Sequence, residues 1–228
     1  MHAANCTNIK ISNCIFLNAS QGRWRNIDGF DVCGGYYGGC LNLLIQNCIF
    51  NGSISGLNIP GTVIQNNIFL GNNDAFDGLN VYNNGGCYTS SYIINATIQN
   101  NIFYRANPIN FTSGCAFNNN ISYSPATTFS AMPGSGNLDN TDPQFTNFPV
   151  AGDYFSYAHN FHLLAASLGH NAGTDGKDIG FYGGVFPSST SGEVLGVPVI
   201  RQMNLQNTNV IQGGNVNVKV RSTKARIN

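Results

Sequence analysis

Four aspartates could carry chemistry in this sequence: Asp28, Asp31, Asp74 and Asp77. Asp28 and Asp77 each precede a glycine that opens a short apolar segment, so they hold matching positions in two copies of one pattern. If each copy is one turn of stacked β-structure, two turns separate them, or roughly 10 Å. That distance lies at or beyond the upper end of the separation of about 6.5–9.5 Å between the acid and base of an inverting glycosidase.

Calcium binding is a second chemistry open to these carboxylates. A calcium ion held by Asp28 and Asp77 would acidify the α-proton of a uronate sugar, and an arginine would act as the base. Arg23, Arg25 and Arg105 are the candidates for that base. The alternative is that an aspartate before a glycine caps a turn by bonding its own backbone. Our candidate catalytic residues are Asp28, Asp31, Asp77 and Arg105.

Aromatic residues accompany these charges in long insertions between the repeated segments, at residues 17–28, 33–42, 70–77 and 82–92. Trp24 is the only tryptophan and lies between Arg23 and Arg25. Loops on a rigid scaffold are where binding sites are commonly built. The expected substrate-binding residues are Arg23, Trp24, Arg25, Tyr36, Tyr37, Asn58 and Asn80. The alternative for Trp24 is that it packs beneath its own loop.

An internal repeat sets the elements that position these residues. One asparagine recurs at the same position of each copy, and we call these residues the marker asparagines: Asn13, Asn47, Asn66, Asn100 and Asn119. Successive marker asparagines are 34, 19, 34 and 19 residues apart. Each turn has about 20 residues and three short apolar segments that read as strands. Leucine-rich and ankyrin repeats contain less strand and more helix than this. The repeat therefore predicts an all-β parallel β-helix.

Stacking places like residues over like in such a fold. We expect an inward ladder of Ile11, Ile45, Ile64, Ile98 and Phe117. The marker asparagines should form a second ladder, with side-chain amides bonded from coil to coil. A further strand is expected at residues 29–32, 56–59, 78–81 and 108–111, with an outward column of Asp31, Asn58, Asn80 and Asn110.

Composition excludes some partners. Charged residues are 9% of the chain and the formal net charge is zero, so it has no basic footprint for nucleic acid and no polybasic membrane patch. The sequence contains no run of 18 apolar residues, so it predicts no membrane-spanning helix. Seven cysteines leave at least one thiol unpaired. Cys14 and Cys48 share a repeat position and should stack as small buried side chains, whereas Cys33 and Cys40 could close a loop.

The chain divides into three parts. Residues 1–184 form the β-helix, of which 124–184 are degenerate terminal coils; residues 185–197 are a linker, and residues 198–228 a β-hairpin tail with a turn at Gly213-Gly214. The repeat begins almost at once, without a capping unit or signal peptide. We therefore expect the C-terminal part of a longer, secreted protein whose signal peptide lies upstream.

The chain resembles the right-handed parallel β-helix proteins of the pectate-lyase-like superfamily, in particular those secreted by bacteria. The resemblance lies in the Ile-x-Asn-Asn-Ile-Phe segments and in the ending from Asp142-Pro143-Gln144-Phe145 to Asp178-Ile179-Gly180-Phe181-Tyr182-Gly183-Gly184. In enzymes of this superfamily the substrate lies along the outside of one sheet, between long loops. The resemblance implies that the column of Asp31, Asn58, Asn80 and Asn110 belongs to that sheet.

Two functions follow from these observations. The first is a secreted or surface protein that binds polysaccharide, as part of a polysaccharide lyase or glycoside hydrolase, with calcium as the one cofactor considered. The second is a non-catalytic structural or adhesive solenoid of a bacterial or phage surface. Acidic residues that converge in one groove beside an arginine would favour the enzyme, and aspartates used in backbone turns would favour the scaffold.

Overall fold

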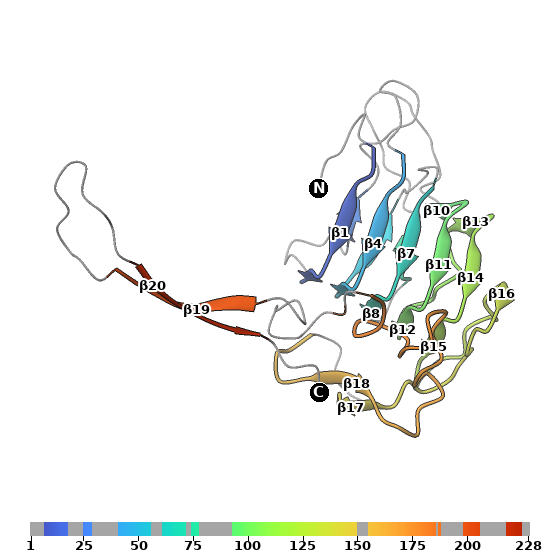
Figure 1. Ribbon diagram of the computed structural model, residues 1–228. Coiled ribbons are helices and arrows are strands. Elements are labelled where there is room, and N and C mark those ends of the chain that lie inside the picture. Colours follow the sequence, from blue (N-terminus) through green and yellow to red (C-terminus); the bar gives the residue numbers. More distant parts are fainter. Residues whose placement is uncertain are drawn as a thin grey trace.

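The computed structural model describes residues 7–17, 25–28, 41–55, 61–71, 74–77, 93–149, 155–185, 187, 198–205 and 218–224. Within these residues the protein is all-β, without a helix, and most strands lie in stacked parallel sheets (Figure 1). This arrangement is consistent with the expected parallel β-helix.

Three parallel sheets form the coils. Sheet I contains β1 (Lys10–Ser12), β4 (Leu44–Gln46), β7 (Val63–Gln65), β11 (Thr97–Gln99), β14 (Ala116–Asn118) and β16 (Gly134–Ser135). Sheet II contains β2 (Ile15–Phe16), β5 (Ile49–Phe50), β8 (Ile68–Leu70), β12 (Ile102–Tyr104) and β15 (Ile121–Tyr123). Sheet III contains β3 (Arg25–Asp28), β6 (Ser53–Ser55) and β9 (Phe76–Asp77), while β10 (Ile93–Ile94) pairs separately with β13 (Thr112–Ser113).

The inward ladder of sheet I is confirmed. Ile11 pairs with Ile45, and the register continues through Ile64, Ile98 and Phe117. A second inward column in sheet II stacks the rings of Phe16, Phe50, Phe69 and Phe103, with successive centroids 4.8–5.0 Å apart. The two columns face one core because side chains alternate between the faces of each short strand.

Each bend from sheet I to sheet II uses a marker asparagine in left-handed conformation, with φ between 49° and 56°. Asparagine tolerates this region better than most residues. A matching bend before sheet I contains Asn8, Asn42, Gly61, Asn95 and Gly114, all with positive φ. A Cβ added to Gly61 would lie 2.5 Å from Asn42 Oδ1, so the asparagine of one coil occupies the space above the glycine of the next.

The amide ladder lies one residue further along than predicted. Asn67 Nδ2 donates to Asn101 Oδ1, Asn101 Nδ2 to Asn120 Oδ1 and Asn120 Nδ2 to Asn137 Oδ1, at 3.0–3.1 Å. Several marker asparagines instead direct their amides out of the stack: Asn47 Nδ2 donates to the carbonyls of Phe181 and Gly183. The residue after the left-handed bend is the one that turns back into the core.

The terminal coils expected over residues 124–184 form only in part. Leu138 bridges to Ile121 and β16 joins sheet I, which makes a sixth, partial coil. Beyond it, β17 (Phe145–Asn147) pairs antiparallel with β18 (Asn160–Leu163). Residues 160–184, here called the covering segment, then pack Phe161, Leu163, Ile179 and Phe181 on the outer isoleucines of sheet II. The outer face of sheet II is apolar. A segment that packs on it removes this surface from water, which a further coil at the end of the stack would not do.

One expected strand is a turn in the structure, and the expected hairpin of the tail is described only in part. Residues 108–111, expected as a strand, form a turn in which Thr112 Oγ1 donates to the Ile109 carbonyl and Phe111 has a φ of 57°. In the tail, β19 (Pro198–Leu205) pairs antiparallel with β20 (Val218–Lys224). The Gly213-Gly214 turn of the predicted hairpin lies outside the described residues.

Candidate functional site

A groove lined by described residues lies where the chain leaves sheet II. Its volume is about 760 Å³, within the usual range of ligand sites. Three successive parts of the chain line it: Asp74 before β9, Arg105 and Asn107 after β12, and Ser124 with residues 126–129 after β15. We call it the Asp74–Arg105 groove. It brings together two residues that the sequence had singled out from separate repeats.

Asp74 is held by the coil that follows it in the stack. Residue 74 bridges in parallel to Asn107, and Ala75 N donates to the Asn107 carbonyl at 2.9 Å. The Asp74 carboxylate accepts a hydrogen bond from Asn110 Nδ2 at 2.8 Å. These contacts fix the acidic side of the groove, and they place Asn110 beside Asp74 on a turn.

Arg105 adopts a backbone conformation that is rare for a residue with a side chain. Its φ is 58°, and its N–H donates to the Tyr123 carbonyl at 2.7 Å. Its Cζ lies 5.7 Å from the centroid of the Tyr104 ring, within cation–π range. Burial is the main cause that raises the pKa of Tyr104. The phenol therefore stays neutral, and Arg105 supplies a positive charge to the groove.

The far wall of the groove is polar, with one aromatic ring. Phe129 N donates to Asn140 Oδ1 at 2.8 Å, and Asn140 Nδ2 returns a bond to the Phe129 carbonyl at 3.0 Å. Thr127 Oγ1 donates to Ser124 Oγ at 3.1 Å. The reciprocal amide bonds anchor the half-buried Phe129, so the wall presents a fixed ring beside hydroxyl groups.

This combination of groups suits a ligand rich in hydroxyls. A carboxylate accepts hydroxyl hydrogen bonds, a guanidinium donates to hydroxyl or carboxylate oxygens, and an aromatic ring packs on an apolar sugar face. Among the described lining residues, Asp74 is the single carboxylate, whereas glycoside hydrolysis uses a pair. The groove as described is therefore equipped for binding, and it lacks a paired acid and base.

Sheet III carries the predicted catalytic aspartates. Asp28 pairs with Ser55, and Ser55 pairs with Asp77, so the two aspartates occupy equivalent places two strands apart. This confirms their matching positions, at roughly 10 Å along the stack. Arg25 starts the same strand as Asp28. The side chains of these three residues lie outside the description, so their catalytic and calcium-binding roles remain predictions.

The predicted catalytic residue Asp31 lies outside the described residues, and so do these predicted binding residues: Arg23, Trp24, Tyr36, Tyr37, Asn58 and Asn80. The structure adds groove residues that the sequence did not indicate, above all Asn107 and Phe129. Residues 124–140 open the degenerate terminal coils and are rich in Pro, Ser, Gly and Asn, a composition typical of irregular loops. Phe129 does not occupy a position of the repeat. Its placement follows from the two hydrogen bonds between the Asn140 side chain and the Phe129 backbone.

The thiols of the described residues do not line the groove. Cys14, Cys48 and Cys115 are free. Burial raises the pKa of the Cys48 thiol to about 12, so it is no nucleophile. Among the described residues, no group of three His, Cys, Asp or Glu side chains could hold a metal ion. His170 Nδ1 lies 2.8 Å from Asp178 Oδ1 in the covering segment, and this oxygen also accepts from Asn171 N at 2.9 Å.

No protein-family model, curated protein or solved structure matches this chain. The part of the chain that the structure describes contains no helix long and apolar enough to cross a membrane. The ligand of the protein must therefore be inferred from its own side chains.

Proposed function

We propose that this protein binds polysaccharide outside the cell, as a right-handed parallel β-helix protein of the pectate-lyase-like type. The observation that carries the proposal is the Asp74–Arg105 groove, in which an acid, a cation, hydroxyl groups and a fixed aromatic ring line about 760 Å³. The stacked parallel sheets and the left-handed asparagine bends support the fold assignment.

Each side of the groove has a role in holding a sugar. Asp74 accepts from two neighbouring hydroxyls, Arg105 donates to a ring oxygen, a hydroxyl or a uronate carboxylate, and Phe129 packs on the apolar face of a ring. A charge-assisted hydrogen bond contributes about 1.5–3 kcal/mol, so loss of Arg105 should weaken binding roughly 10- to 100-fold.

A polysaccharide lyase or hydrolase is the second candidate, and one observation favours it. Asp28 and Asp77 lie in register on sheet III, with Ser55 between them. A substrate on the outer face of that sheet would pass both aspartates. Substitution of Asp28 or Asp77 by Asn would then abolish product release, measured as new reducing ends or as unsaturated sugars with and without calcium, while binding persists.

The test of binding uses Arg105→Gly. A left-handed conformation costs an ordinary residue about 1–2 kcal/mol, which glycine does not pay, although glycine gains about 0.4–1 kcal/mol of freedom in the unfolded chain. The variant should therefore remain folded while it loses the guanidinium. Gln144→Gly is the matched control, because Gln144 has a φ of 54°, is exposed and does not line the groove.

Calorimetric titration with neutral and acidic oligosaccharides should show binding to the unmodified protein and to Gln144→Gly. For Arg105→Gly we expect affinity to fall at least tenfold with an unchanged unfolding midpoint. If no oligosaccharide binds the unmodified protein, polysaccharide binding is refuted and a structural or adhesive solenoid remains. Equal affinity of the two glycine variants would exclude this groove as the site.

A further inference from the structure

A second groove, of about 360 Å³, lies on the outer face of sheet I and shares no lining residue with the Asp74–Arg105 groove. The sheet forms its floor and the covering segment forms one wall, which continues to Val185. Hydrogen bonds from a marker asparagine hold this wall against the sheet. Asn100 Nδ2 donates to Thr174 Oγ1, and Thr174 N donates to Asn100 Oδ1. We call this the glutamine groove.

A glutamine ladder runs along the floor. Gln65 Nε2 donates to Gln46 Oε1 at 3.0 Å, and Gln99 Nε2 donates to Gln65 Oε1 at 2.9 Å. Each ladder bond uses one of the two N–H groups of an amide nitrogen. The second N–H of each amide can therefore meet a ligand oxygen, and the coil spacing repeats this donor about every 4.8 Å.

Asn66 also lines the glutamine groove and carries a buried acceptor. Its side chain is 3% exposed, and its Oδ1 has no hydrogen-bond partner among the described residues. A buried acceptor without a partner destabilises the protein, so a hydroxyl that reached this oxygen would be stabilising. Gly184 confines the Asn66 amide, since a Cβ added there would clash with Asn66 Nδ2.

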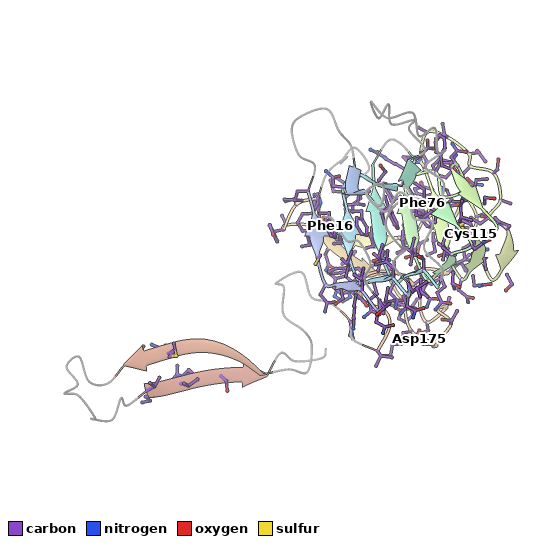
Figure 2. All side chains as sticks on the ribbon, turned by 90° about the horizontal axis from the view of Figure 1, so that it is seen from above. Phe16, Phe76, Cys115 and Asp175 are labelled. Carbon is purple, nitrogen blue, oxygen red and sulfur yellow. The ribbon has the colours of Figure 1, made fainter. Side chains whose placement is uncertain are left out.

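The charges of the glutamine groove balance. Lys10 contributes one positive charge and Asp175 one negative charge, and Asp175 projects from the margin of the coil stack (Figure 2). Leu44 and Val185 add apolar surface, with Val185 77% exposed. A row of amide donors, one buried acceptor and apolar flanks with no net charge match a neutral ligand that carries many hydroxyls.

We infer that the glutamine groove is a second carbohydrate site, which binds a neutral oligosaccharide along the direction in which the coils stack. Sugar hydroxyls accept from Gln46, Gln65 and Gln99 and donate to Asn66 Oδ1, and one hydroxyl can do both. The inference rests on the same ligand class as the proposed function, but it uses different residues. A chain held in both grooves would bind with increased avidity.

The side-chain amide signals of the glutamines report directly on this site. We would titrate the nitrogen-15-labelled protein with cellohexaose, xylohexaose and mannohexaose, and follow these signals by NMR. Val185→Trp should block the groove without altering the ladder, because Val185 lies on its exposed wall. Leu168→Trp is the matched control, because Leu168 is 66% exposed and does not line the groove.

We expect at least one hexasaccharide to shift the signals of Gln65 and Gln99. Val185→Trp should weaken that response at least tenfold, whereas Leu168→Trp and Arg105→Gly should leave it unchanged. Glutamine signals that stay constant with all three sugars would overturn the inference, and so would equal responses of the two tryptophan variants. If the signals of Arg105 and Asn107 then still shift, the proposed function stands without a second site.

Discussion

Substitution of Asn101 by Ala tests the amide ladder, which lies one residue after the marker asparagines that the sequence had indicated. Asn101 is fully buried. The two N–H groups of its Nδ2 are shared among three acceptors, the carbonyls of Ile64 and Gln99 at 2.9 Å and Asn120 Oδ1 at 3.0 Å. Its Oδ1 accepts from both the backbone N–H and the Nδ2 of Asn67, each at 3.0 Å. The side chain therefore joins three successive coils.

The expected loss of stability follows from these bonds. Alanine leaves the buried Asn67 N–H without its partner, which costs about 1–3 kcal/mol, and each other lost bond costs about 0.5–1.5 kcal/mol. Some of these groups share partners after relaxation, so we expect Asn101→Ala to lower the free energy of unfolding by roughly 4 kcal/mol. Domains of ordinary stability have only about 5–15 kcal/mol in total.

Urea unfolding followed by circular dichroism measures this loss, with Asn118→Ala as the control. Asn118 lies at a neighbouring place in β14, but its side chain faces outward and accepts one bond, from Ser135 Oγ at 3.2 Å. We expect the control to change stability by about 0.5 kcal/mol or less. Equal, small losses in the two variants would refute the ladder at Asn101.

Three further predictions concern single positions. Gly184→Ala should destabilise the protein by about 1–3 kcal/mol in thermal unfolding, because φ is 84° and the new methyl group would meet Asn66 Nδ2. Cys48 should resist thiol reagents at neutral pH until the protein unfolds, since burial raises its pKa to about 12, and labelling of Cys48 in the native protein would contradict this. Burial lowers the pKa of His162 below its ordinary value of 6.5, so its contribution to stability is present above pH 6.5 and is lost as the pH falls through its folded pKa. His162→Phe should reduce the fall in melting temperature upon acidification, and an unchanged fall would exclude His162 as its cause.

Local periodicity accounts for the predictions that were confirmed. Side chains alternate along a strand, and the repeat of 34 and 19 residues sets which strands lie together, so the spacing alone aligned the column from Ile11 to Phe117. The matching positions of Asp28 and Asp77 followed for the same reason. The sequence also showed which asparagines bend the chain, although their side chains bond elsewhere than predicted.

Only the tertiary structure decided how the repeats meet segments outside the repeat. The covering segment carries no periodic signal, and it packs on sheet II because the outer isoleucines there are apolar. Its return along the marker asparagines directs the amides of Asn47 and Asn100 outward and builds the wall of the glutamine groove. Asp74 and Arg105 meet because their coils stack, which the repeat sets, but the far wall of their groove comes from Ser124 and residues 126–129, outside the repeat. The repeat thus determined the architecture by local alternation, whereas one wall of each candidate site depends on long-range contacts that no spacing in the sequence encodes.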